Sequence, residues 1–453
     1  MLMEGRDRQV MALSQNTSSE HKRKWKQLSR WERIRLVAED KSVIFTGLLR
    51  HINAETLSEA FNAIDGSKAL GVDGVSKATY GKNLEGNLAN LARQIKVGSY
   101  KPQKKREVLI PKGNGQTRPI VISCFEDKLV EWVIGKILEQ VYEPLFIRNS
   151  FGFRPNKSAH QAIEASYYSL KEGKRSHVVE IDFTSCFNSI PHRELIKLLF
   201  KRISEDAFIG LIGRFLKVGC LNQLGDTVNP EAGTPQGSIM SPILANIYLD
   251  EVIDQWFLRT YGSYSNILVR YADDAVFFFH KKEIAEQFVS DLEERVDEFR
   301  LTLNADKTKL VDFGKDKHQD FDFLGFTFYW GRKPLFGGRR LKIKTAKKTL
   351  HKKIEAFESW IKSRRSAEKL TALMKTARIK LLGHYRYYGY VINLGGLNHF
   401  YFQVTRILFK WLNRRSQKPS FDWVVFERKL KQFAIPPTPP MANLRILGWS
   451  PYV

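Results

Sequence analysis

Residues 267–279 read ILVRYADDAVFFF, and this stretch decides how the chain folds. Two runs of β-branched and aromatic residues flank Asp273 and Asp274, which predicts a β-hairpin with two adjacent carboxylates at its turn. Adjacent anions repel each other, and a divalent metal ion bound by carboxylate oxygens turns that repulsion into coordination. Asp is also a common turn residue, so a solvated turn explains the pair equally well. Other parts of the chain must distinguish a metal site from a simple turn.

A second acidic element lies at residues 178–192, which read VVEIDFTSCFNSIPH. An apolar strand places Asp182 at its end, and a tight turn carries Phe183 and Phe187 into the same neighbourhood before a helix begins. A carboxylate at the end of a buried strand is a rigid way to present a metal ligand, although Asp also serves as an ordinary helix cap. Two aspartate sites at the ends of apolar strands are what a two-metal phosphoryl-transfer centre requires. Together they favour the metal interpretation.

Composition sets the size and the partner class. The chain has 453 residues, of which 43% are hydrophobic, enough for the cores of two or three domains. Its formal net charge is +25, which indicates a polyanionic partner, a solvated basic surface or a membrane-facing one. Aromatic residues make up 12% of the chain and are interleaved with the cations, which suits stacking on bases. Nucleic acid is therefore the favoured partner.

The cysteines and the hydropathy of the chain limit the cellular compartments in which we expect the protein. The three cysteines form no Cys-x-x-Cys pair, so neither a zinc module nor a disulfide framework is indicated: Cys124, Cys186 and Cys220. No apolar run approaches the length of a membrane span, and the first residues lack the apolar core of a signal peptide. We expect a soluble, intracellular protein with no membrane partner.

The N-terminal third contains two basic elements. Residues 21–26 read HKRKWK and precede Trp31 on a predicted helix, which contacts RNA or packs on a neighbour through its Trp residues. Residues 104–120 predict two strands around a Gly-Asn-Gly turn, with Lys112 and Arg118 at its edges. Such cations can clamp a triphosphate, while solvated edge-strand charges are the alternative.

Further along the chain, glycine marks several loops. Residues 233–242 read GTPQGSIMSP, and the glycines near Gln236 allow a close backbone approach to a ligand, a weak signal when taken alone. Residues 151–156, FGFRPN, predict a loop before a helix capped by Ser158, and residues 321–328 predict another hairpin. The alternation of strands and helices favours an α+β or α/β core domain.

The composition changes at Gly331. A basic run, residues 339–344, leads into three predicted helices at residues 347–361, 370–382 and 397–412. Residues 384–390, HYRYYGY, are predicted to lie between the last two helices. They suit a helical domain that grips a duplex, or else an ordinary bundle with tyrosines in its core. Residues 436–440, PPTPP, predict a stiff connector or terminus.

These motifs, in this order, resemble the group II intron-encoded reverse transcriptases, or maturases, of the bacterial type without an endonuclease domain. The resemblance rests on ordered blocks between residues 54 and 433: GVDG, IPKGNGQTRPI, FGFRP, EIDFTSCF, GTPQGSIMSPILANIYLD, RYADD, LNADKTK, FDFLGF and GHYRYYG. It implies an α+β right-hand polymerase, with fingers and palm built from antiparallel sheet plus helices and followed by a helical thumb, or maturase, domain. The implied divisions are a basic extension (1–52), fingers and palm (53–330), thumb or maturase domain (331–433) and a Pro-rich tail (434–453).

The resemblance also implies roles for individual residues. The catalytic carboxylates are expected to be Asp182, Asp273 and Asp274, which with Phe183 form the metal site for two Mg²⁺ ions, or Mn²⁺ in their place. The expected nucleotide-binding residues are Lys112, Arg118, Phe187, Gln236 and Lys307, with Phe187 excluding the ribose 2′-hydroxyl. The primer grip is expected at Phe323, Leu324, Gly325 and Phe326, and nucleic-acid contacts at Arg339, Arg340, Lys342, Lys344 and Arg386.

The implied activity is RNA-directed DNA synthesis, with an RNA template, a DNA or RNA primer, deoxynucleotides and a structured intron RNA as partners, in a bacterial cytoplasm. Asn188 stands where many relatives carry a further Asp, and no Cys-x-x-Cys or His-Asn-His nuclease motif is present. We therefore do not expect endonuclease-primed mobility. The alternatives are a free-standing enzyme recruited to DNA repair or antiphage defence, a maturase that only binds RNA for splicing, and an RNA-dependent RNA polymerase. The oligomeric state stays open, a dimer included.

Overall fold

The computed structural model describes residues 27–113, 116–222, 225–228, 230–262, 265–332, 338–415 and 420–447. Their contacts divide the chain into two compact units, each assembled from separated segments. The first unit comprises Met1–Pro155, Phe183–Arg259 and Glu293–Leu303, and the second comprises Asn156–Asp182, Thr260–Leu292 and Asn304–Val453. The domain boundaries predicted at residues 52, 330 and 433 remain a prediction.

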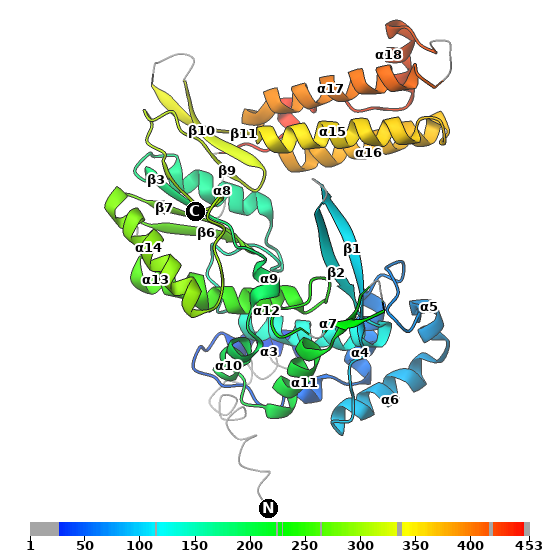
Figure 1. Cartoon of the computed structure of the whole chain (residues 1–453), viewed down its shortest axis with the longest axis vertical. Coiled ribbons are helices and arrows are strands. Elements are labelled where there is room, and N and C mark those ends of the chain that lie inside the picture. Colours follow the sequence, from blue (N-terminus) through cyan, green and yellow to red (C-terminus); the bar gives the residue numbers. More distant parts are fainter. Residues whose placement is uncertain are drawn as a thin grey trace, which may run out of the picture. The chain divides into compact units, whose positions relative to one another are not determined.

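The first unit is mainly helical and carries one four-stranded sheet, ordered β2-β1-β4-β5 (Figure 1). Its β1–β2 hairpin is antiparallel, as predicted, and residues 114–115 at its turn lie outside the described residues. The elements are α3 (Arg30–Ala38), η1 (Leu49–His51), α4 (Ala54–Ala63), α5 (Lys77–Tyr80), η2 (Gly81–Asn83), α6 (Leu84–Lys96), β1 (Lys105–Gly113), β2 (Gln116–Ile122), α7 (Phe125–Tyr142), α9 (Cys186–Ser189), α10 (His192–Phe200), α11 (Asp206–Lys217), β4 (Cys220–Leu221), β5 (Thr227–Val228), α12 (Ser241–Leu249), η3 (Asp250–Gln255) and α13 (Trp256–Thr260).

The second unit contains two sheets and the C-terminal helices. One sheet has the order β6-β7-β3-β8 and the other β11-β10-β9, and every pairing within them is antiparallel. The elements are α8 (Ala159–Leu170), β3 (His177–Ile181), β6 (Ile267–Tyr271), β7 (Asp274–Phe279), α14 (Lys282–Glu298), β8 (Lys309–Asp312), β9 (Phe321–Phe323), β10 (Phe326–Arg332), β11 (Arg339–Thr345), α15 (Lys347–Arg364), α16 (Leu370–Tyr388), η4 (Val391–Asn393), α17 (Leu394–Leu412), α18 (Trp423–Gln432) and η5 (Met441–Asn443). The predicted α+β class is confirmed.

The predicted hairpin at residues 267–279 forms the centre of the second unit. β7 is buried along residues 275–279, and the Phe277 and Phe279 rings lie 4.4 and 5.0 Å from that of Phe288 on α14. Burial of a phenylalanine side chain stabilises the fold by roughly 1.5–3 kcal/mol. The run of apolar residues thus produces a strand covered on both faces, and the hairpin turn between β6 and β7 is rigidly supported.

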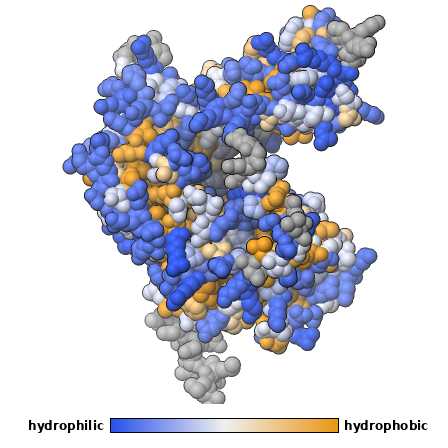
Figure 2. All heavy atoms as spheres, in the orientation of Figure 1, coloured by the Kyte–Doolittle hydropathy of each residue, from blue (hydrophilic) through white to orange (hydrophobic). Residues whose placement is uncertain are grey.

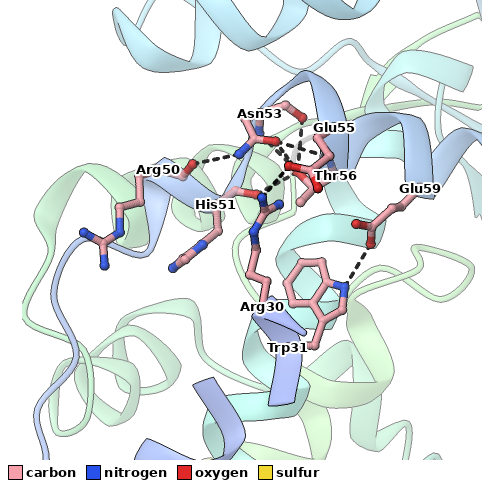
Figure 3. A network of polar contacts seen from close by, with 8 residues as sticks. All are labelled: Arg30, Trp31, Arg50, His51, Asn53, Glu55, Thr56 and Glu59. Atoms are coloured by element: carbon pink, nitrogen blue, oxygen red, sulfur yellow. Dashed lines mark hydrogen bonds and ion pairs between the residues drawn. The ribbon is translucent and has the colours of Figure 1, made fainter. Parts of the chain in front are cut away.

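Helices α3 and α4 are joined by polar contacts (Figure 3). Trp31 donates from its indole nitrogen to Glu59 at 2.9 Å, and the Arg30 guanidinium lies 2.5 Å from the Glu55 carboxylate. Capping boxes at Ser29 and Asn53 satisfy the free amides at the start of both helices. Packing, rather than RNA contact, therefore accounts for Trp31, while the basic run at residues 21–26 lies outside the described residues.

The C-terminal helices differ from the sequence prediction in length. α16 extends to Tyr388, so most of the HYRYYGY motif is helical instead of lying between two helices. Three of its tyrosines are buried, which fits the alternative of a bundle with tyrosines in its core: Tyr385, Tyr388 and Tyr390. The visible surface of α15–α17 is largely hydrophilic (Figure 2). No helix in the described ranges has the length and apolar content needed to cross a membrane.

Candidate active site

Strand register brings Asp182 and Asp274 together in the second unit. β3 and β7 are antiparallel neighbours, and Ile181 at the end of β3 pairs with Ala275 near the start of β7. Asp182 directly follows Ile181, and Asp274 directly precedes Ala275, so the two carboxylates extend the same pair of strands. Asp273 lies in the turn that Tyr271 and Asp274 close. The three predicted catalytic residues therefore converge on one end of the β6-β7-β3-β8 sheet.

The electrostatics of this cluster show that the carboxylates interact. The pKa of Asp274 is raised to about 6, first by desolvation and then by the negative charges of Asp273 and Asp182. Lys307 opposes this rise, and its ammonium lies 2.9 Å from Oδ2 of Asp182. Asp274 retains solvent-exposed surface, so its desolvation is partial. The three carboxylates repel one another, and a bound cation would relieve that repulsion.

The carboxylates do not enclose a metal ion as they stand. Within the described residues, no group of three or more His, Cys, Asp or Glu side chains is arranged to hold one. One oxygen of Asp182 is instead paired with Lys307. The donor set suits a hard divalent cation, because such ions take carboxylate oxygens. The Lys307 ammonium competes with an ion for that oxygen of Asp182.

A buried arginine supports the turn, although sequence reasoning gave it no role. Arg270 is fully buried in β6 and donates from Nη1 to the Ala272 carbonyl at 2.9 Å. Ala272 has a φ of +58°, which is unusual for a residue with a Cβ. The available signal was a cation inside an otherwise apolar strand, since an arginine is almost never fully buried without partners. Arg270 holds the strained turn that carries Asp273.

Two predicted nucleotide-binding residues meet in the first unit. Arg118 on β2 donates from Nε to the Gln236 side-chain oxygen at 2.6 Å. The Gln236 carbonyl accepts from the Val121 amide at 2.8 Å, so its loop lies along β2. Lys112 lies on β1, and its side chain is outside the described residues. The β1–β2 hairpin and the GTPQGS loop are therefore joined at the predicted nucleotide site.

The glycines around Gln236 allow close contacts within the protein. A Cβ on Gly237 would lie 2.3 Å from the Val121 carbonyl oxygen, and one on Gly233 would lie 2.8 Å from the Asn188 backbone. Both glycines also have positive φ values. These contacts with the protein's own backbone fix the loop, and the predicted approach to a ligand stays a prediction.

Glu131 anchors the same loop, and the sequence analysis did not predict this role. Its buried carboxylate lies 3.1 Å from the Lys105 ammonium and accepts from the Ser123 hydroxyl and the Ile239 amide at 2.9 and 3.0 Å. Lys105 begins β1 and Ile239 follows Gln236 in the loop, so one carboxylate connects β1, α7 and the loop. The helix pattern does not reveal this role, because Glu131 is one of several acidic residues on α7 and such residues usually face solvent.

The predicted primer-grip residues form a tight turn. Phe323 and Phe326 are buried and paired, and Leu324 and Gly325 between them have φ values of +48° and +79°. Such a two-residue turn matches the twist of its strands. The Tyr387 hydroxyl donates to the Leu324 carbonyl at 3.0 Å, and a Cβ on Gly325 would lie 2.8 Å from the Tyr388 hydroxyl oxygen. The end of α16 therefore clamps the turn.

The predicted nucleic-acid contacts divide between two elements. Alternation along β11 buries Leu341 and Ile343 and places Arg340, Lys342 and Lys344 on the opposite face. Arg339 has a different environment, donating to the Lys315 carbonyl and the His318 ring. Arg386 is exposed on α16. Phe183 and Phe187, from the metal and nucleotide sets, are both buried in the first unit.

Comparison with known proteins finds a family match in the central part of the chain. Residues 110–328, which contain most of the β1–β2 hairpin, both aspartate elements and the predicted primer-grip turn, match the family model described as reverse transcriptase (RNA-dependent DNA polymerase). The match to this family covers just under half of the chain. Members of this family use divalent metal ions, which agrees with the carboxylate cluster.

Among curated relatives of this chain, Protein YkfC of Escherichia coli is 36% identical over 233 residues, covering 50% of this chain and 61% of that protein. The group II intron-encoded protein LtrA of Lactococcus lactis is 35% identical over 225 residues, covering 49% and 37%. The predicted resemblance to group II intron-encoded reverse transcriptases is confirmed. The matched region spans less than two thirds of either relative.

Among solved structures, apo telomerase from Candida tropicalis aligns with 73% of this chain and 61% of that chain, at 13% identity and a TM-score of 0.45. A TM-score this low supports no assignment of fold or function.

Proposed function

We propose that this reverse transcriptase extends a primer on an RNA template with deoxynucleotides, using Asp182, Asp273 and Asp274 as catalytic carboxylates. The observation that carries the proposal is the register of β3 and β7, which sets Asp182 beside the turn that holds the other two. Two Mg²⁺ ions, or Mn²⁺, bound there would activate the primer 3′-hydroxyl and stabilise the leaving pyrophosphate. The mutual repulsion that raises the Asp274 pKa supports cation binding.

Other residues have roles that follow from their positions. Lys307 neutralises Asp182 in the absence of ions and is free to turn toward the pyrophosphate once a cation replaces it. Arg118, oriented by Gln236, presents its guanidinium to the triphosphate, a task suited to its fork of donors. Phe187 is a bulky ring at the position that excludes a ribose 2′-hydroxyl. This last role favours DNA over RNA as the product.

The template and an intron RNA are proposed partners. Arg340, Lys342 and Lys344 make one basic face on β11, which suits contact with a phosphate backbone. Binding of a structured intron RNA by such surfaces would assist splicing and mobility. Splicing-competent intron RNA bound in the absence of primer extension would instead indicate a maturase that acts only as an RNA-binding cofactor.

The test is primer extension on a long RNA template with dNTPs and Mg²⁺, comparing the native chain with Asp273→Asn. We expect DNA product from the native chain and a loss of at least about a hundredfold in the variant, because electrostatic stabilisation of phosphoryl transfer depends on the bound ions. Asp297→Asn, the same isosteric change at an exposed position of α14, serves as the matched control and should retain full activity.

Three results would contradict the proposal. No DNA product from a native chain that binds RNA would leave only the RNA-binding function. Equal extension with ribonucleotides would indicate an RNA polymerase. Full activity in Asp273→Asn would show that the carboxylate cluster takes no part in the chemistry.

A further inference from the structure

The FGFRP loop contains an aromatic residue in an unfavourable position. Phe153 has a φ of +56°, and 56% of its surface is exposed. A left-handed backbone is costly for a bulky residue and is normally taken by glycine or asparagine. Exposure of a phenylalanine ring contributes nothing to the core. Neither local conformation nor burial explains why this position carries a phenylalanine.

The rest of the loop is built to hold that position. Arg154 is buried, and its guanidinium makes three hydrogen bonds to the Glu143 carboxylate, at 2.9–3.3 Å. Its Nη1 also donates to the carbonyls of Ile147 and Ser150, both at 2.6 Å. The Gly152 carbonyl accepts from Asn246 on α12 at 2.8 Å. A strained backbone conformation that is held in place by this many contacts is typical of functional positions.

Phe153 lies against the proposed sugar-excluding residue. The two rings of Phe153 and Phe187 meet edge to face, with centroids 6.1 Å apart and an interplanar angle of 87°. This is a preferred geometry for aromatic pairs. The Phe187 backbone is fixed separately, since its carbonyl accepts from the Thr234 amide at 2.6 Å. The backbone hydrogen bond fixes the main chain of Phe187, and the contact with the Phe153 ring restricts rotation of the Phe187 side chain.

We infer that Phe153 is a positioning residue for nucleotide selection: its ring holds the Phe187 ring in the rotamer that excludes a ribose 2′-hydroxyl. This inference rests on the proposed function and names a determinant of its substrate class. The exclusion is steric, so it is only as strong as the resistance of the Phe187 ring to rotation. Phe153 supplies that resistance through its edge-to-face contact with the Phe187 ring, which explains why a strained, largely exposed aromatic residue stands there.

The test measures kcat/KM for single incorporation of a deoxynucleotide and of the matching ribonucleotide, opposite the same template base. We expect Phe153→Ala to raise ribonucleotide kcat/KM about tenfold, mainly through a lower KM, since a loosened steric contact is worth a factor of 10 to 200. Phe187→Ala, which removes the excluding ring itself, sets the upper limit. Phe153→Tyr keeps the ring and should keep native discrimination.

Two further variants separate positioning from stability. Phe153→Gly removes the ring and relieves the left-handed strain, so it should be no less stable than Phe153→Ala while losing the same discrimination. Phe200→Ala removes an exposed phenylalanine from α10 of the same unit and should leave discrimination at the native value.

The outcomes are distinguishable from those of the parent proposal. Native discrimination in both Phe153→Ala and Phe153→Gly, with discrimination relaxed in Phe187→Ala, overturns the inference and leaves the polymerase function standing. Loss of deoxynucleotide incorporation in a folded Phe153→Gly also overturns it, because the ring would then be needed for incorporation itself. A native chain that incorporates neither nucleotide overturns both.

Discussion

At the scale of single residues, the buried charges of the first unit set how stability responds to pH. Asp127 on α7 accepts hydrogen bonds from the Tyr100 hydroxyl and the Gln103 amide. Its pKa is nevertheless raised to about 7, because desolvation outweighs these bonds and Glu131 adds repulsion. The ordinary value for this carboxyl is 3.8. The folded chain therefore binds a proton at Asp127 over a range in which the unfolded chain has lost it.

The sign of the resulting pH dependence follows from linkage. Between about pH 4 and pH 7 the folded state holds more protons than the unfolded state at Asp127, so this residue makes the free energy of unfolding fall as pH rises. Above pH 7 its contribution is constant. We expect Asp127→Asn to gain stability relative to the native chain as pH rises from 5 to 8, measured by urea denaturation at each pH. Asp297→Asn is the control, and a parallel pH profile for native and Asp127→Asn chains would contradict the assignment.

The sequence singled out residues that the structure brings together, and their roles stay predictions. The three aspartates, Arg118 and Gln236 were singled out from the sequence, and the structure brings the aspartates together in one cluster and Arg118 and Gln236 together in another. Glu131 and Arg270 were not predicted, because their importance comes from burial and from partners distant in sequence. A polar residue within an apolar strand or helix is the signal that points to such positions.

At the scale of elements, the C-terminal segment of residues 434–447 is bound to the end of α16. The Arg445 amide donates to the Gly389 carbonyl at 2.9 Å, and its carbonyl accepts from the Val391 amide at 3.0 Å. The Tyr385 hydroxyl donates to the Pro436 carbonyl at 3.2 Å, and Leu444 is buried. Since the same end of α16 clamps the predicted primer-grip turn through Tyr387 and Tyr388, the segment supports that turn indirectly.

Truncation tests this support. We expect removal of residues 434–453 to raise the KM for the template-primer several-fold with a smaller effect on kcat, because the loss of these three hydrogen bonds and of the buried Ile435 and Leu444 loosens the turn without touching the carboxylates. Removal of residues 448–453 alone is the control. Steady-state primer extension at varied duplex concentration gives both constants, and an unchanged KM would show that α16 holds the turn unaided.

The basic face of β11 gives a second prediction at this scale. If Lys342 and Lys344 contact phosphates, Lys342→Ala/Lys344→Ala should reduce the slope of log K against log salt by roughly 1.4–1.8, the contribution of two phosphate contacts. Lys281→Ala/Lys282→Ala changes the net charge equally at exposed positions before and at the start of α14 and should leave the slope unchanged. Filter binding of an RNA–DNA duplex at several salt concentrations measures both. Equal slopes for the two double variants would mean that only net charge matters.

Elements with a strong period were predicted well, and their ends were not. The hairpin at residues 267–279 and the helix capped by Ser158 follow the sequence closely, because apolar patterns and capping residues are local. The sequence predicted that this helix ends at residue 382, whereas α16 ends at Tyr388. The prediction was too early because Gly383 and the tyrosines that follow interrupt the apolar period. Packing of Tyr388 against Phe326 and of His384 against Phe400 extends the helix, and that packing depends on residues far away in sequence.

At the scale of the whole molecule, the two units are not consecutive stretches of chain. The chain passes from one to the other between residues 155 and 156, 182 and 183, 259 and 260, 292 and 293, and 303 and 304. Composition could not predict this division, because the change at Gly331 marks where helices begin rather than where contacts separate.

The interleaving has a consequence for biosynthesis. Strand β3 lies between β7 and β8 in its sheet, and both neighbours are translated after it. At about 5–20 residues per second, β3 waits roughly 7–26 s for β8 to follow it from the ribosome. Until β7 emerges the apolar residues of β3 have no sheet to join, and one edge of β3 stays unpaired until β8 follows, which is the condition that recruits chaperones. On stalled ribosomes, we expect residues 156–182 to resist protease only when the chain has emerged beyond Asp312, and protection of shorter nascent chains would show that β3 finds another partner first.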